Sequence, residues 1–145
     1  MMLLVDSSVF IASFDPVSDN YQNSLDLLNT LCRRSIQITM PAHGWFEIQC
    51  TFQRLQNENR FVGPIINGQM NYQIELIHID AAFIKKYQMV DIPYTKAGDH
   101  IFVVIAKVNG YPLVTNDLGM IKVARQCGVQ VFSPKEYADK LVSGA

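Results

Sequence analysis

Four acidic residues, Asp6, Glu47, Asp99 and Asp117, stand where strands are predicted to end or helices to begin. Asp6 and Asp117 follow short apolar runs that are typical of buried strands, whereas Glu47 and Asp99 open segments with helical periodicity. In a parallel sheet, the carboxyl ends of the strands and the N-termini of the following helices share one edge. The four carboxylates are therefore predicted to meet in one crevice.

A crevice shared by four carboxylates has a chemical consequence. Like charges held close together repel, so bound protons or a cation must offset the repulsion. Oxygen ligands without a cluster of Cys or His suit Mg²⁺ or Mn²⁺. Such ions activate water and stabilise the charge on a phosphate. The pattern therefore favours phosphoryl chemistry assisted by a divalent metal.

Each acid also has a structural interpretation when it is taken alone. Asp6, Asp99 and Asp117 each precede a predicted helix and could serve only as its N-cap. Glu47 lies early in its helix, where a negative charge is favourable in any case. The functional interpretation therefore depends on the fold bringing the four side chains together.

Short apolar runs alternate with helical patterns along the chain. Strands are predicted at residues 3–5, 36–40, 74–79, 113–115 and 129–132. Helices are predicted at residues 7–14, 21–31, 42–59, 81–89, 99–108 and 118–126, with a last helix opening at Ser133-Pro134 and a loop over 60–73. This alternation predicts an α/β sandwich around a mostly parallel sheet. The whole chain, residues 1–145, is expected to form one domain.

The composition is typical of a folded protein rather than a disordered one. Hydrophobic residues make up 49% of the 145 residues and charged residues 17%. The net charge of −1 argues against wrapping duplex DNA by bulk electrostatics. The three cysteines form no zinc-binding pattern and are expected to be buried thiols. No signal peptide or membrane-spanning run is recognised, so we expect a soluble, cytoplasmic protein.

Four sequence segments carry a resemblance to a known family. They are LLVDSSVFIA around Asp6, PAHGWFEIQ around Glu47, KAGDHIFVVIAK around Asp99 and YPLVTNDLGMIKVA around Asp117. Their order and spacing resemble those of the PIN domains and, within that family, the VapC-type toxins of bacterial toxin–antitoxin pairs. The likeness spans nearly the whole chain, and the first and last segments are its most specific parts. It implies a three-layer α/β/α sandwich and a Mg²⁺- or Mn²⁺-dependent endoribonuclease that hydrolyses phosphodiester bonds in single-stranded RNA.

The resemblance also implies roles for individual residues. Thr115, in the Thr-Asn-Asp motif, and Ser7 or Ser8 would hydrogen-bond the acids or a metal-bound water, with Thr115 favoured. Relatives often carry a further acid two residues after the last Asp, where this chain has Gly119. We therefore expect one firmly held ion and a second that depends on substrate. The implied metal ligands and catalytic acids are Asp6, Glu47, Asp99 and Asp117.

The three histidines are weaker candidates. His43 shares a helix face with Glu47 and could approach the crevice, whereas the turn of the helix is expected to aim His100 away from it. His78 is expected to be structural, within a strand. Two further acids, Asp80 and Asp91, are expected to be helix caps or loop residues.

Cationic and aromatic residues supply candidate RNA contacts. Lys96 is the favoured phosphate contact because it lies close to Asp99, and Phe61 and Tyr72 are the favoured stacking residues. Solvated helix faces account for most of the other cations, Arg33, Arg34, Lys85, Lys86 and Lys122. The aromatic residues expected in the core are Trp45, Phe46 and Phe52.

Three rival interpretations were weighed. A haloacid-dehalogenase-like phosphatase needs a second Asp two residues after the first, where this chain has Ser8, and a receiver domain needs an acidic pair near the start. The main alternative is a catalytically weak PIN-like module that binds RNA or a protein. Expected partners are RNA, a cognate antitoxin protein and a second copy of the chain in a homodimer.

Overall fold

A five-stranded sheet positions the site. The computed structural model describes residues 2–58 and 73–144. Within them the sheet has the order β3-β2-β1-β4-β5, and every neighbouring pair is parallel, which confirms the predicted parallel sheet. The strands are β1 (Leu3–Val5), β2 (Ile38–Pro41), β3 (Ile74–Ile77), β4 (Leu113–Val114) and β5 (Val131–Phe132).

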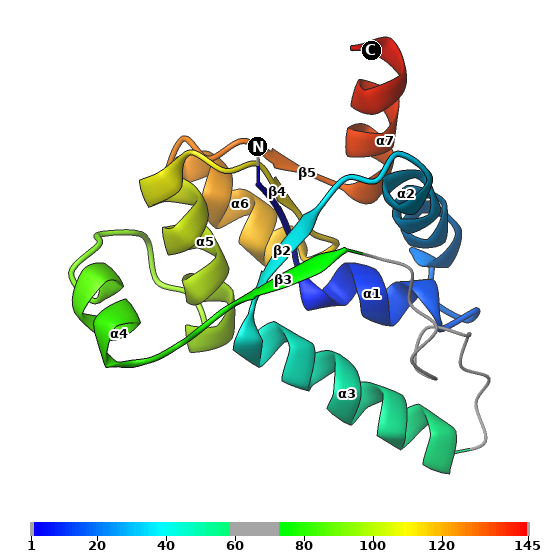
Figure 1. Cartoon of the computed structure of the whole chain (residues 1–145), viewed down its shortest axis with the longest axis horizontal. Helices are drawn as coiled ribbons and strands as arrows, with labels where there is room; N and C mark the ends of the chain where they lie inside the picture. The colour runs from blue at the N-terminus through cyan, green and yellow to red at the C-terminus, as the bar shows by residue number, and fades with distance from the viewer. Residues whose placement is uncertain (1, 59–72, 145) are drawn as a thin grey trace.

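Helices cover both sides of this sheet. They are α1 (Ser7–Ser13), α2 (Tyr21–Arg33), α3 (Ala42–Asn57), α4 (Ala81–Tyr87), α5 (Ala97–Asn109), α6 (Leu118–Gln126) and α7 (Pro134–Ser143). Helices α5 and α6 pack together on one side of the strands, and α1, α2 and α7 pack together on the other (Figure 1). Helix α3 packs against α1 and the strands β2 and β3. The expected three-layer α/β/α arrangement is therefore confirmed.

Helix α5 is central because the residues in its middle are apolar on more than one face. Residues Phe102 to Ala106 are all buried, so the helix is apolar on more than one side. Gly110 ends it in the left-handed conformation, with φ of 70°, which other residues adopt only at a cost. At the other end of the chain, α7 begins with Pro134 as predicted, and a capping box between Ser133 and Glu136 stabilises its start.

Several predicted boundaries and burial states are corrected. Strand β3 ends at Ile77, so His78 lies beyond it and is exposed rather than within a strand. Helix α5 begins at Ala97, so Asp99 is its third residue and not its N-cap. Phe46 was expected in the core but is 72% exposed, whereas Trp45 and Phe52 do pack against the core.

Other expectations are corrected or lie outside the described residues. Cys50 is exposed, and Cys32 and Cys127 are only partly buried, whereas all three were expected to be buried. The predicted loop over 60–73, including Phe61 and Tyr72, falls outside the described residues except for its last position. Across residues 2–58 and 73–144, no helix is both long and apolar enough to cross a membrane.

Replacing Leu4 by Ala tests the importance of the central strand. Leu4 is fully buried and lies opposite Thr39 on β2 and Leu113 on β4. The cavity is expected to lower the free energy of unfolding by about 2–5 kcal/mol, measured as a shift of the urea midpoint. The control is Val142→Ala on α7, where a 72% exposed side chain should change stability by about 0.5 kcal/mol or less. Equal shifts of the urea midpoint in the two variants would contradict the assignment of Leu4 to the core.

Candidate active site

The four acids highlighted by the sequence come together at one edge of the sheet. Asp6 directly follows β1 and Asp117 lies three residues beyond the end of the neighbouring strand β4, while Glu47 and Asp99 come from α3 and α5. The pKa of Asp99 is raised first by burial and then by the charges of the other three acids. The four carboxylates therefore lie close enough for their charges to interact, and the region they share is called the crevice.

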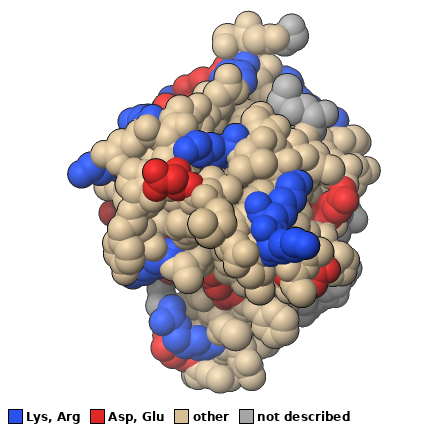
Figure 2. All heavy atoms as spheres, turned by 90° about the vertical axis from the view of Figure 1, so that its left-hand side faces the viewer, with Lys and Arg blue, Asp and Glu red and all other residues tan. Residues whose placement is uncertain are grey.

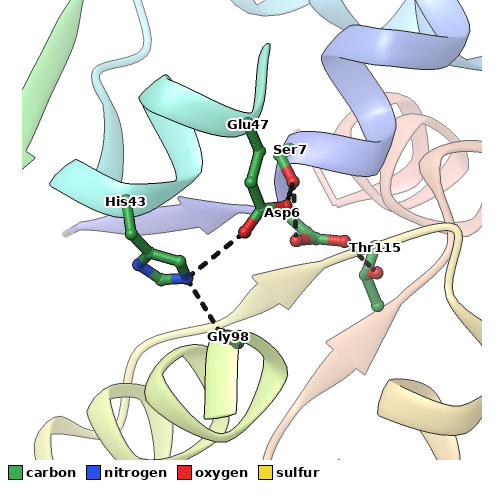
Figure 3. Close-up of polar contacts among 6 residues, drawn as sticks. All are labelled: Asp6, Ser7, His43, Glu47, Gly98 and Thr115. Atoms are coloured by element: carbon green, nitrogen blue, oxygen red, sulfur yellow. Dashed lines mark hydrogen bonds and ion pairs between the residues drawn. The ribbon is translucent and has the colours of Figure 1, made fainter. Parts of the chain in front are cut away.

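Asp6 lies deepest in this crevice, with only 5% of its surface exposed. Its Oδ2 accepts a hydrogen bond of 2.9 Å from the Thr115 hydroxyl (Figure 3). Burial raises the pKa of Asp6, hydrogen bonds from Ser8 and Thr115 oppose this rise, and the charge of Glu47 adds to it. Asp6 occupies the N-cap position of α1, but its side chain makes no capping hydrogen bond to that helix.

Ser7 links the first strand to helix α3. Its buried hydroxyl donates to Glu47 Oε2 at 2.8 Å and lies 3.5 Å from Asp6 Oδ1 (Figure 3). Glu47 itself is exposed, in contrast to Asp6. The Ser7 hydroxyl therefore lies between two carboxylates, Asp6 and Glu47, that are far apart in the sequence but adjacent in space. Of the two serines left open by the sequence, Ser7 bonds Glu47, and hydrogen bonds from Ser8 lower the pKa of Asp6.

The Thr-Asn-Asp motif is held by a network of short hydrogen bonds. The Thr115 hydroxyl accepts from the Asp117 backbone N–H at 3.0 Å while it donates to Asp6. The Ser8 hydroxyl lies 3.4 Å from that of Thr115 and accepts from the Asn116 N–H at 3.1 Å. One threonine thus orients both Asp6 and the segment that carries Asp117.

Asn116 is a positioning residue that sequence reasoning missed. Its side-chain amide donates to the hydroxyl of the fully buried Ser24 on α2, at 2.9 Å, and lies 3.4 Å from the Ser8 carbonyl. These bonds anchor the turn after β4 to two helices. The available signal was its place inside the motif, but its partner in α2 could not be recognised from local sequence.

Asp117 combines a structural role with its place in the crevice. Its Oδ1 accepts from the Met120 backbone N–H at 2.9 Å, so the predicted N-cap of α6 is present. A Cβ at Gly119 would lie 3.1 Å from the same oxygen. A side chain there would crowd the cap, whereas glycine leaves the carboxylate undisturbed.

A hollow of about 350 Å³ opens beside Asp117. Part of its wall is apolar, from Ile11 and Ala12 of α1. Its volume lies in the range of sites that hold small organic groups. The polar residues that line it are Ser8, Asp15, Ser18, Asn20, Asn116 and Asp117.

The remaining polar candidates are placed as follows. His100 lines an apolar groove between α4 and α5, so the expectation that it points away from the acids is confirmed. Asp80 caps α4 by accepting from the Phe83 N–H, also as expected. The exposed Lys96 precedes α5, and its charge lowers the pKa of Asp99. Figure 2 shows Lys and Arg side chains in separate patches on the face that carries α4, rather than in one continuous stripe.

The four carboxylates have the ligand chemistry that a divalent ion requires. All four acids offer oxygen ligands, and the pKa of Asp6 and of Asp99 is raised by burial first and by like charges in addition. A hard cation such as Mg²⁺ or Mn²⁺ would relieve this repulsion. In the part of the chain that the structure describes, no three His, Cys, Asp or Glu side chains are arranged as a ready-made site. The chemistry of the four side chains nevertheless fits such an ion.

Comparisons with known proteins identify the fold. No family model and no curated protein matches the sequence. Among solved structures, VapBC2 from Rickettsia felis, bound to a DNA fragment from their promoter, matches with TM-score 0.53 and 14% identity, covering 92% of this chain and 98% of that one. FitAB bound to the IR36 DNA fragment matches with TM-score 0.53 and 18% identity, covering 93% and 96%. The chain therefore has a PIN-like fold.

The raised pKa of Asp6 predicts how stability depends on pH in the absence of metal. A raised pKa means that the folded protein holds the proton more tightly than the unfolded chain does. This contribution is complete below the ordinary value of 3.8 and is lost as pH rises through the raised pKa. With EDTA present, urea unfolding should therefore show Asp6→Asn gaining stability relative to wild type between acidic and neutral pH. A relative loss over that range would contradict the prediction, and the exposed Asp139→Asn is the control.

The paired bonds of Thr115 predict a clear difference between two substitutions. Thr115→Val keeps the shape but leaves buried Asp6 and the Asp117 N–H without their partner. We expect the free energy of unfolding to fall by about 1.5–3 kcal/mol, as for bonds to charged groups. Thr115→Ser keeps the hydroxyl and should lose less in the same urea titration. Equal losses would show that the methyl group, and not the hydroxyl, matters.

Proposed function

We propose that this protein is a divalent-metal-dependent endoribonuclease that hydrolyses single-stranded RNA. The observation that carries the proposal is that hydrogen bonds of Ser7 and Thr115 hold Glu47, Asp6 and the Asp117 backbone beside one another, with Asp99 close enough for their charges to act on it. Four carboxylates on four separate segments favour a cation, and oxygen ligands favour Mg²⁺ or Mn²⁺. The PIN-like fold supports the same class of activity.

The residues of this chain would have different roles at the proposed metal centre. Asp6 and Asp99 are the first choices for direct ligands, and Glu47 and Asp117 would bind directly or through water. The Thr115 and Ser7 hydroxyls orient these carboxylates. When bound, the ion would activate water for attack on the phosphodiester and stabilise the charge on the phosphate.

The substrate would approach from the side of the hollow. The hollow shares Asp117 and Ser8 with the site and has an apolar wall against which a nucleotide could lie. Lys96 is the closest cationic candidate for a phosphate contact, because its charge reaches Asp99. Gly119, in place of a further acid, favours one firmly held ion and a second that depends on the RNA phosphate.

A partner protein is also proposed. The structural neighbours VapBC2 and FitAB are two-component assemblies by name. We therefore propose that this chain is a toxin whose cognate antitoxin places a basic side chain among the acids, and that the chain forms a homodimer. Co-purification of a small partner protein tests the antitoxin proposal, and charge reversal of an acid in the crevice should release that partner. Sedimentation of the purified chain tests whether it forms a homodimer.

A second function, a PIN-like module that binds RNA without cutting it, is favoured by one observation. The described residues hold no ready-made metal site, and Asp117 Oδ1 is already engaged in capping α6. Binding of single-stranded RNA in the presence of EDTA, with no cleavage at saturating Mg²⁺ or Mn²⁺, would support this module over the nuclease.

Asp6→Asn tests the nuclease directly, because it keeps the shape and removes the charge. Cleavage of single-stranded RNA should require Mg²⁺ or Mn²⁺, stop with EDTA, and fall by about 100-fold or more in the variant. Asp139→Asn, on the exposed face of α7, is the matched control and should cleave as wild type does. Unchanged metal-dependent cleavage by Asp6→Asn would refute the assignment.

A further inference from the structure

His43 connects the two helices that bring Glu47 and Asp99 to the site. It is the second residue of α3, one turn before Glu47. Its Nε2 lies 3.0 Å from the carbonyl oxygen of Gly98 and 3.6 Å from Glu47 Oε1 (Figure 3). Gly98 immediately precedes Asp99 on α5. One ring nitrogen therefore contacts one acid of the crevice and the backbone next to another.

The hydrogen-bond partners define the orientation of the ring. A carbonyl oxygen only accepts, so His43 Nε2 carries the hydrogen and donates it to Gly98. The other nitrogen, Nδ1, is buried and has no hydrogen-bond partner in the described part of the chain. An unprotonated Nδ1 avoids burying a donor without an acceptor. The ring also packs edge-on against the buried Phe102, with centroids 5.4 Å apart.

The two helices approach closely at this point and share little contact elsewhere. A Cβ at Gly98 would lie 3.4 Å from Glu47 Oε1 and 3.6 Å from His43 Nε2. Among the described residues, α3 packs mainly on α1, β2 and β3, whereas α5 packs mainly on α6, β2 and β4. The bond from His43 to Gly98 thus joins two helices that both pack on β2 but otherwise pack on different elements.

We propose that His43 is a positioning residue that fixes the separation of Glu47 and Asp99 for metal binding. The hydrogen bond to Gly98 sets where α5 begins relative to α3, and the His43 ring lies beside Glu47 Oε1, while the other oxygen of Glu47 is held by Ser7. Residues that orient metal ligands without touching the ion contribute strongly to affinity. The inference rests on the proposed metal-dependent function, and it adds a residue that the four-acid pattern does not contain.

Two substitutions separate the hydrogen bond from the packing of the ring. His43→Phe keeps an aromatic ring against Phe102 and removes Nε2, whereas His43→Gln keeps an N–H that can reach the Gly98 carbonyl. Mn²⁺ affinity is measured by titration calorimetry, and the Tm of the metal-free protein by circular dichroism. We expect about a 10-fold weaker Mn²⁺ affinity for His43→Phe and about a 3-fold change or less for His43→Gln. His78→Phe, at an exposed position beyond β3, is the matched control and should bind as wild type does.

The outcomes distinguish this inference from the proposed function. Wild-type affinity in a folded His43→Phe variant would overturn the inference alone, as would equal weakening of both His43 variants at unchanged Tm. If His43→Phe folds poorly, His43→Leu provides the same comparison with a smaller side chain. No Mn²⁺ binding by wild type, or equal binding by wild type and Asp6→Asn, would overturn the proposed function and this inference with it.

Discussion

Asp6 is a buried carboxylate within electrostatic reach of Glu47 and Asp99, and the surrounding polar groups are arranged around its charge. Burying such a group is unfavourable unless hydrogen bonds or a cation compensate. Hydroxyl groups from β1–α1 and from the end of β4 provide part of this compensation. The part of the burial cost that these bonds do not offset raises the pKa of Asp6. This uncompensated charge is the physical basis for expecting a bound cation.

The register of two neighbouring strands explains how the central pair is formed. Val5 on β1 lies opposite Val114 on β4, so the next residues, Asp6 and Thr115, leave the sheet side by side. The Asp6 backbone N–H also bonds the Val114 carbonyl at 2.9 Å. The sheet therefore determines one half of the site with little freedom. Helices α3 and α5 supply the other half, and there single contacts such as the one from His43 to Gly98 matter more.

Local sequence pattern was sufficient for the architecture and for most of the acidic set. Apolar runs alternating with helical periodicity predicted the parallel sheet, since each element has its own hydrophobic period. The positions of Asp6 and Asp117 after strands then predicted a common edge. Element ends were less well predicted, because β3 and β5 end or begin where pairing with a neighbour stops rather than where apolar residues do. Phe46 was wrongly expected in the core, because a sequence pattern does not show which side chains of a helix neighbouring elements will cover.

The sequence by itself determined the types of the elements, the sheet class and the identity of the four acids, because these depend on neighbours within a few residues. Only the tertiary structure decided which hydroxyl serves which carboxylate, that Asn116 is anchored to Ser24, and that His43 reaches Gly98. These partners lie between 40 and 109 residues apart in the chain. Their contacts arise from strand order and helix packing, which no local spacing contains.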